Sequence, residues 1–312
     1  MDSTIIINKG IDTGTFATNG LLPEEVAEQF LDMTYEATPL GKLIRHEKHR
    51  AKSGKINKIG IDSRIIRAKD EGVDDGYRAG VKTESISYEC KAIKLPWQMS
   101  GETLRENIEQ AKLEGKITNL MTSQYGRDTE DLGINGDEST ANTDPDYDFL
   151  KLNNGFKKLI TTGGHIYDAY TAANGVMSIQ TFYDAAITMP SKYLTPELRW
   201  LMSPRRALKW QEVLMQAGIQ AGGFAPNNVF TSPANIPIVE VPRLDDSTVL
   251  LVNPQNLIQV NTYDIMLKKD ATSKEAIYKD MIYYIMHNDV DFVIEELDAT
   301  LAITNLNPVL SA

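Results

Sequence analysis

Residues 97–136 have the pattern of one long amphipathic helix that is entered from a strand and left through a glycine-containing turn. Apolar side chains recur at helical spacing between residues 104 and 125, but the stripe is narrow and drifts around the axis. Ser100 is placed to cap the helix N-terminus. A helix over residues 101–131 would be ~46 Å long at 1.5 Å per residue. Such a length with so thin an apolar face predicts a strut with other segments laid across it.

Two segments before this helix alternate apolar and polar residues with a period of two, at residues 55–66 and 84–95. That period is typical of β-strands. Because a charged segment with three glycines lies between them, the simplest structure is a long β-hairpin with a large tip. Two isolated strands are marginally stable in water, so the hairpin is expected to need a surface beyond its own, such as a neighbouring subunit.

The N-terminal residues 1–20, rich in Thr, Asn and Gly, predict an extended arm without a core of its own. A short helix is expected over residues 22–38, with Pro23 and acidic residues in its first turn. After the long helix, residues 131–137 carry a strong turn signal, and an acidic surface loop follows them.

A compact α/β unit is predicted from residue 178 onward. One helix is expected over residues 178–189, and a second is expected after Ser203 and Pro204, which are favoured N-cap and first-turn residues. Residues 280–306 predict one very long strand or two joined strands. Further strands are expected at residues 198–202, 236–241, 248–253, 257–260 and 263–268.

Composition narrows the classes of function. The chain has 312 residues, is 42% hydrophobic and carries a net charge of −11, which argues against a general nucleic-acid-binding protein. It has no run of 18 apolar residues and no signal-peptide pattern at its start. A single cysteine, Cys90, cannot form an internal disulfide, so a reducing cytoplasm is the expected place of synthesis. The basic residues 42–58, with His46 and His49, are interpreted as a solvated strand edge or loop.

No set of residues has the pattern of a reaction centre. His287, Asp289 and Asp291 alternate along a strand, but the polar face of a strand explains them better than a metal site. The acidic residues 144–148 lack the rest of a calcium loop. Cys90 lies inside a strand pattern without a base beside it, which favours a buried thiol over a nucleophile. We therefore predict no catalytic residue, no cofactor and no metal.

The order of these parts carries a resemblance. The segments WQMSGETLRENIEQ (97–110), RDTEDLGINGD (127–137), LRWLMSPRRALKWQEVL (198–214) and DMIYYIMHNDVDFVIEELDATLAIT (280–304) weigh most in it. With the arm and the hairpin, they resemble the major capsid protein of tailed bacteriophages, which has the α+β Hong Kong 97-like fold. The implied parts are an N-terminal arm (1–50), an extended β-hairpin or E-loop (51–97), a peripheral domain with the spine helix (98–177), an axial domain (178–262) and closing strands of the peripheral domain (263–312).

This resemblance implies a structural protein, not an enzyme, that assembles with itself through hexamers and pentamers into an icosahedral shell around packaged double-stranded DNA. It further implies a separate scaffolding protein and a portal, no membrane, assembly in the host cytoplasm and a place in the virion. Expected inter-subunit contacts are Arg67, Lys69, Arg78 and Lys82 at the hairpin tip, and Gly222, Gly223 and Asn227 in a small-residue loop at residues 217–228. An encapsulin-type nanocompartment shell is the nearest alternative, and a cytoplasmic α/β enzyme with an unrecognised site is a third.

Overall fold

The computed structural model describes residues 38–61, 64–66, 68, 76–102, 111–216, 232–262 and 266–309. The predicted arm at residues 1–20, the predicted helix at 22–38 except its last residue, and the loop at 217–228 lie outside these ranges. So do hairpin-tip residues Arg67 and Lys69. Within the described residues, no helix has the length and apolar character needed to cross a bilayer.

The first of two larger sheets is built around its longest strand, β11 (Met281–Ile294). Along its first ten residues β11 pairs antiparallel with β4 (Lys91–Ser100). Its other edge pairs successively with β10 (Met266–Asp270) and β9 (Leu257–Asn261), and β1 (Arg45–Lys48) adds parallel to β9. β1 lies at the edge of this sheet, so four residues of the basic segment 42–58 form an edge strand.

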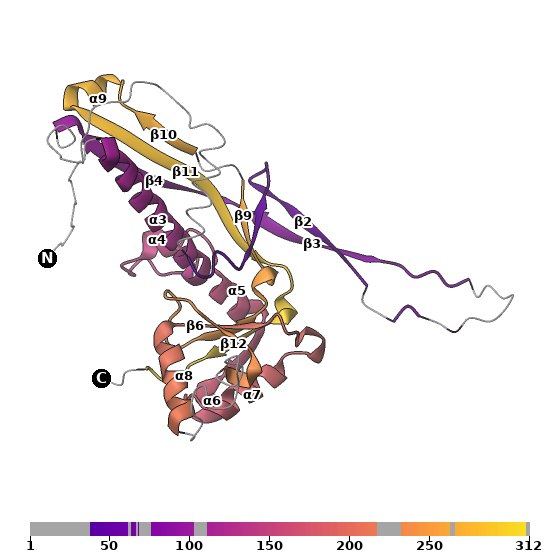
Figure 1. Cartoon of the computed structure of the whole chain (residues 1–312). Coiled ribbons are helices and arrows are strands. Elements are labelled where there is room, and N and C mark those ends of the chain that lie inside the picture. The colour runs from indigo at the N-terminus through magenta and orange to yellow at the C-terminus, as the bar shows by residue number, and fades with distance from the viewer. Residues whose placement is uncertain are drawn as a thin grey trace.

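Helix α3 (Ala111–Asn135) lies along one face of this sheet, as the strut pattern predicted (Figure 1). The predicted turn at residues 131–133 is wrong, because the helix continues to Asn135. Leu132 and Ile134 are buried there, and a Cβ at Gly133 would lie 2.8 Å from the ring of Phe292. Only glycine lets the last helical turn approach the sheet this closely, so the glycines of this segment serve packing as well as turning.

The second sheet has the strand order β5-β12-β8-β6-β7. Its strands are β5 (His165–Asp168), β12 (Thr300–Thr304), β8 (Val249–Val252), β6 (Arg199–Met202) and β7 (Ile238–Glu240). Three helices pack on one face: α6 (Ala169–Ala173), α7 (Ile179–Thr188) and α8 (Pro204–Gln216). Helix α5 (Phe156–Gly163) packs on the other face and also contacts α3 and β11, so it fills the space between the two sheets.

Sheet membership divides the chain differently from the predicted domain boundaries. The segment predicted as one or two strands near the C-terminus is two strands, but β11 lies in the first sheet and β12 in the second. Likewise β9 belongs to the first sheet although it falls in the predicted axial segment. β5 belongs to the second sheet although it falls in the predicted peripheral segment. The strands at 236–241 and 248–253 are found as β7 and β8, with β6 between them.

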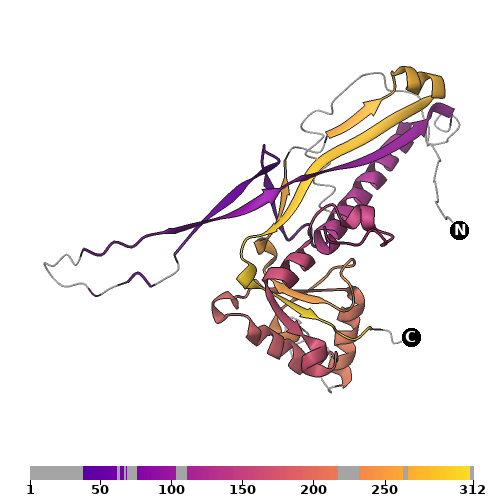
Figure 2. The same ribbon diagram turned by 180° about the vertical axis from the view of Figure 1, so that it is seen from behind.

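A third, two-stranded sheet is the predicted hairpin, formed by β2 (Ser53–Gly60) and β3 (Lys82–Glu89). It projects away from the rest of the molecule in both views (Figures 1 and 2). The predicted second strand at 84–95 is wrong as one unit, because Cys90 separates β3 from β4, and β4 pairs with β11 instead.

The remaining described elements are short. They are α4 (Tyr147–Leu150), α9 (Lys274–Lys279), and the 3-10 turns Ser191–Tyr193, Pro233–Asn235, Pro254–Asn256 and Leu297–Ala299.

Candidate inter-subunit surfaces

The base of the hairpin is fixed to the first sheet by apolar packing. Tyr88 and Cys90 are buried against Ile258, Val260 and Val293. The Tyr88 side chain also covers Gly54 on the facing strand, where a Cβ would lie 2.6 Å from the tyrosine oxygen. Any larger residue at that position would displace the ring. These contacts fix the base of the hairpin, which we call its root, to the rest of the molecule, which we call the body.

Cys90 itself is the buried thiol that the sequence predicted. Burial raises the pKa of this thiol to about 11, which keeps it protonated at neutral pH. Its Sγ donates to the carbonyl oxygen of Val260 at 3.8 Å. A protonated, enclosed thiol packs as a small apolar side chain.

Two acidic residues of β11 hold the same root through polar contacts. Lys52 forms an ion pair with Asp289 at 3.2 Å, and the Glu89 backbone N–H donates to the Asp291 carboxylate at 2.7 Å. Burial raises the pKa of Asp291. These residues belong to the His287, Asp289, Asp291 series. In the described part of the chain no three potential metal ligands converge. Asp289 and Asp291 contact Lys52 and Glu89, which lie more than about 200 positions earlier in the chain, and a local sequence pattern cannot show such contacts.

Further out, an ionic cluster joins the two hairpin strands. Lys58 pairs with Glu84 at 3.0 Å, and Lys82 pairs with Glu84 at 2.5 Å. The hydrogen bonds from Lys82 and Lys58 lower the pKa of the Glu84 carboxyl to about 2. Lys82, a predicted inter-subunit contact, thus has a partner in its own hairpin. Arg78 donates to the carbonyl oxygen of Tyr77 at 2.8 Å.

The outer half of the hairpin exposes large apolar side chains, which the sequence analysis did not include among the expected inter-subunit contacts. Ile66 is 92% exposed and Ile59 is 73% exposed. The others are Ile61, Ile65 and Val81. Strand alternation places residues 59 and 61 on the same face, and Ile59 pairs directly with Thr83, two residues after Val81. Their alternation was visible in the sequence, but the exposure of both hairpin faces was not.

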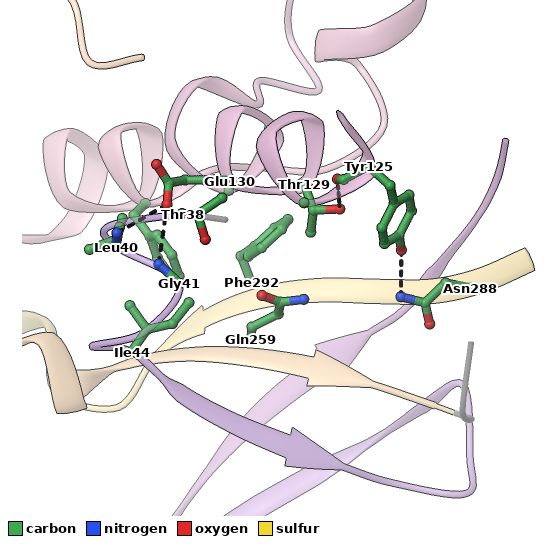
Figure 3. Close-up of a pocket in the computed structure, with 13 residues that line it drawn as sticks. Thr38, Leu40, Gly41, Ile44, Tyr125, Thr129, Glu130, Gln259, Asn288 and Phe292 are labelled. Atoms are coloured by element: carbon green, nitrogen blue, oxygen red, sulfur yellow. Dashed lines mark hydrogen bonds between the residues drawn. The ribbon is translucent and has the colours of Figure 1, made fainter. Parts of the chain in front are cut away.

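A second candidate surface begins where the N-terminal segment meets α3 (Figure 3). The Glu130 carboxylate accepts the backbone N–H groups of Leu40 at 3.0 Å and Gly41 at 3.1 Å. Burial raises the pKa of Glu130. Beside it, the Asn288 amide donates to the Tyr125 hydroxyl at 2.7 Å, which ties α3 to β11. The predicted arm therefore leads into a segment that is anchored to the spine helix.

Replacing Glu130 by Ala should lower the free energy of unfolding by about 1–3 kcal/mol, because two backbone donors lose their acceptor. Glu130→Gln keeps one carbonyl oxygen and avoids a partly buried charge, so it should stay within about 1 kcal/mol of the wild type. Urea unfolding of the two variants measures the difference. Equal midpoints for Ala, Gln and wild type would show that Glu130 does not anchor residues 40–41.

We compared the whole chain with known protein families, curated proteins and solved structures. No family model matches it. A protein of Bacillus subtilis (strain 168) named "Putative prophage capsid protein YqbE" is 26% identical over 318 residues, which cover 96% of this chain and 98% of that protein.

Solved structures similar to this one come from several particles. A chain of the satellite phage P4 procapsid including size determination (Sid) protein has a TM-score of 0.65 at 15% identity, covering 89% of this chain and 98% of that chain. A chain from the capsid of a native GTA particle has a TM-score of 0.57 at 13% identity and covers 98% and 100%. The holo-SrpI encapsulin complex from Synechococcus elongatus PCC 7942 gives 0.55 at 11% identity, covering 95% and 94%. The chain has the α+β Hong Kong 97-like fold, and its resemblance to the major capsid proteins of tailed bacteriophages is confirmed.

Proposed function

We propose that this chain is a structural major capsid protein that assembles with itself into an icosahedral shell through hexamers and pentamers. The single observation that carries the proposal is the projecting hairpin (Figure 2). The apolar side chains of its outer half are exposed in the described chain. A monomeric enzyme gains nothing from such an exposed ribbon, whereas a shell subunit can bury it against a neighbour. The curated prophage relative, matched over nearly its whole length, supports the same role.

The partners follow from this role. The shell encloses packaged double-stranded DNA, and a separate scaffolding protein and a portal take part in its assembly in the host cytoplasm. The net charge of −11 fits a wall that does not bind DNA tightly by itself. The loop at residues 217–228, with Gly222, Gly223 and Asn227, surrounds the symmetry axes of the capsomers, because small residues allow copies to approach closely.

An encapsulin-type shell is the second candidate, favoured by the likeness to the encapsulin complex. The two readings differ in what the particle holds. Sedimentation of the purified protein, followed at 260 and 280 nm, tests both. Particles far heavier than a single chain support a shell, and nucleic acid co-sedimenting under nuclease treatment separates a DNA-filled capsid from a nanocompartment.

We further propose that the hairpin tip makes ionic contacts with a neighbouring subunit. Reversing Arg67, Lys69 and Arg78 to Glu should reduce the yield of shells and change its dependence on salt, because salt screens exposed ion pairs. Each pair contributes only about 0–1 kcal/mol, but the contact repeats at every subunit. The midpoint of subunit unfolding serves as the control and should not move. A wild-type yield of shells with an unchanged dependence on salt would show that the tip is only a solvated loop.

A further inference from the structure

The connector between the two sheets, residues 295–299, is also a contact point for the hairpin. It joins the end of β11 in the first sheet to the start of β12 in the second. Asn256 makes three hydrogen bonds with the backbone of the connector. The Asn256 carbonyl oxygen accepts the Glu295 N–H at 3.0 Å. The Asn256 side-chain amide donates to the Glu296 carbonyl oxygen and accepts the Glu296 N–H, both at 2.8 Å. Arg45 pairs with the Glu295 carboxylate at 2.7 Å. The connector is thus fixed to the first sheet.

Lys58 links the hairpin to this fixed connector. Its ammonium lies 2.8 Å from the Glu296 carboxylate and 3.3 Å from the Glu295 carbonyl oxygen, while it also pairs with Glu84. The hydrogen bond to Glu296 raises the pKa of Lys58, so this cation stays charged across the physiological range. One lysine therefore connects both hairpin strands with the segment that joins the two sheets.

The two attachments of the hairpin differ in kind. Near the root, Tyr88 packs in an apolar cluster that salt does not weaken. Ile56 and Ile86 also pack against this cluster. Two residues further along β2, Lys58 contacts the body through an ion pair and a hydrogen bond, and salt weakens partly exposed ion pairs. A ribbon held firmly at its root and weakly further out can pivot about the root.

We propose that Lys58 and Glu296 form a latch that sets the angle of the hairpin relative to the body. When the latch is closed, the hairpin reaches a neighbouring copy in one direction. When it opens, the hairpin pivots about the Tyr88 cluster. The consequence for the shell rests on the proposed function: the angle at which each copy reaches the next determines the curvature of the shell, so an open latch allows shells of several sizes.

Double electron–electron resonance in the unassembled full chain tests the latch itself. Spin labels are placed at Val81→Cys on the hairpin and Gln211→Cys on α8, in a Cys90→Ala background. The latched chain should give one narrow distance distribution. Lys58→Gln and Glu296→Gln should each broaden it, and the double variant should broaden it no further, because the two residues act through one contact. Lys55→Gln removes the same charge from the opposite, exposed face of β2 and should change nothing.

Salt provides a second arm of the test. Raising the ionic strength should broaden the distribution of the latched chain and leave the Lys58→Gln variant unaffected. A distribution that is identical in wild type and both single variants would overturn the latch. A broadened distribution in a protein that forms no shells would leave the latch standing and contradict the proposed function instead. A wider range of shell diameters for Glu296→Gln, measured by electron microscopy, would support both.

Discussion

Replacing residues 61–81 by the dipeptide Asn-Gly is expected to give a folded subunit that forms no shells. The replaced segment is flanked by Gly60 and Lys82, which stay in the chain and are paired with each other in the hairpin. A two-residue Asn-Gly turn closes such a pair with the twist that the strands require. The root cluster around Tyr88 and the contacts of Lys58 remain in the shortened chain. The variant therefore removes the proposed contact surface without touching either sheet.

The comparison has two readouts. Circular dichroism and urea unfolding should show a subunit close to wild type in stability, and sedimentation should show that it stays unassembled. A full-length hairpin with Ile59, Ile61 and Ile66 changed to Thr keeps the length of the ribbon and removes only these exposed apolar side chains. It should also fail to assemble or assemble poorly. A normal yield of shells from the Asn-Gly variant would show that the outer hairpin is not part of the assembly interface.

Trp200→Ala should lower the free energy of unfolding by about 3–5 kcal/mol, the usual cost of truncating a buried tryptophan. Trp200 is fully buried in β6, an inner strand of the second sheet between β8 and β7. Its ring meets Phe182 of α7 edge-on at a centroid distance of 5.0 Å, and its indole N–H donates to the Pro233 carbonyl oxygen at 3.0 Å. The substitution leaves a cavity, and the Pro233 carbonyl oxygen keeps only the hydrogen bond from the Ile236 N–H. Because domains are stable by only about 5–15 kcal/mol, this is a large share of the total.

Leu208→Ala is the matched control for this prediction. Leu208 lies on α8, which packs over the same sheet, but its side chain is 65% exposed. It should change the stability by less than about 0.5 kcal/mol. Urea unfolding followed by tryptophan-independent circular dichroism measures both variants. A Trp200→Ala midpoint equal to that of Leu208→Ala would contradict the assignment of this residue to the core.

Local signals in the sequence predicted the elements of this fold well where neighbouring residues decide them. Ser203 accepts the Arg206 N–H, as its predicted N-cap position requires, and the helix predicted from Ser178 begins there with Ser178 accepting the Thr181 N–H. The alternation in residues 55–66 predicted a hairpin strand because its two faces differ chemically, and the structure has this strand at Ser53–Gly60. The long helix was predicted by periodicity, but its end was not, since the glycine at 133 allows the last helical turn to pack closely against Phe292, which is far away in the chain.

The arrangement of the strands could not be predicted in the same way. β11 and β12 follow each other after only five residues, yet they pair in different sheets, because pairing depends on partners that are distant in sequence. The roles of Asp289 and Asp291 at the hairpin root are hidden for the same reason. Of the predicted inter-subunit residues, Arg78 and Lys82 lie in the described hairpin, and their contacts with another copy stay predictions.

Electron microscopy of the purified full-length protein, with and without a co-expressed scaffolding protein, tests the central claim most directly. The account predicts closed particles with five-fold and six-fold capsomers, in which each hairpin lies across a neighbouring copy and its apolar side chains are covered. Separate capsomers in the absence of the scaffold would agree with the same account. Single chains or small closed oligomers under both conditions, with the hairpin still uncovered, would contradict it.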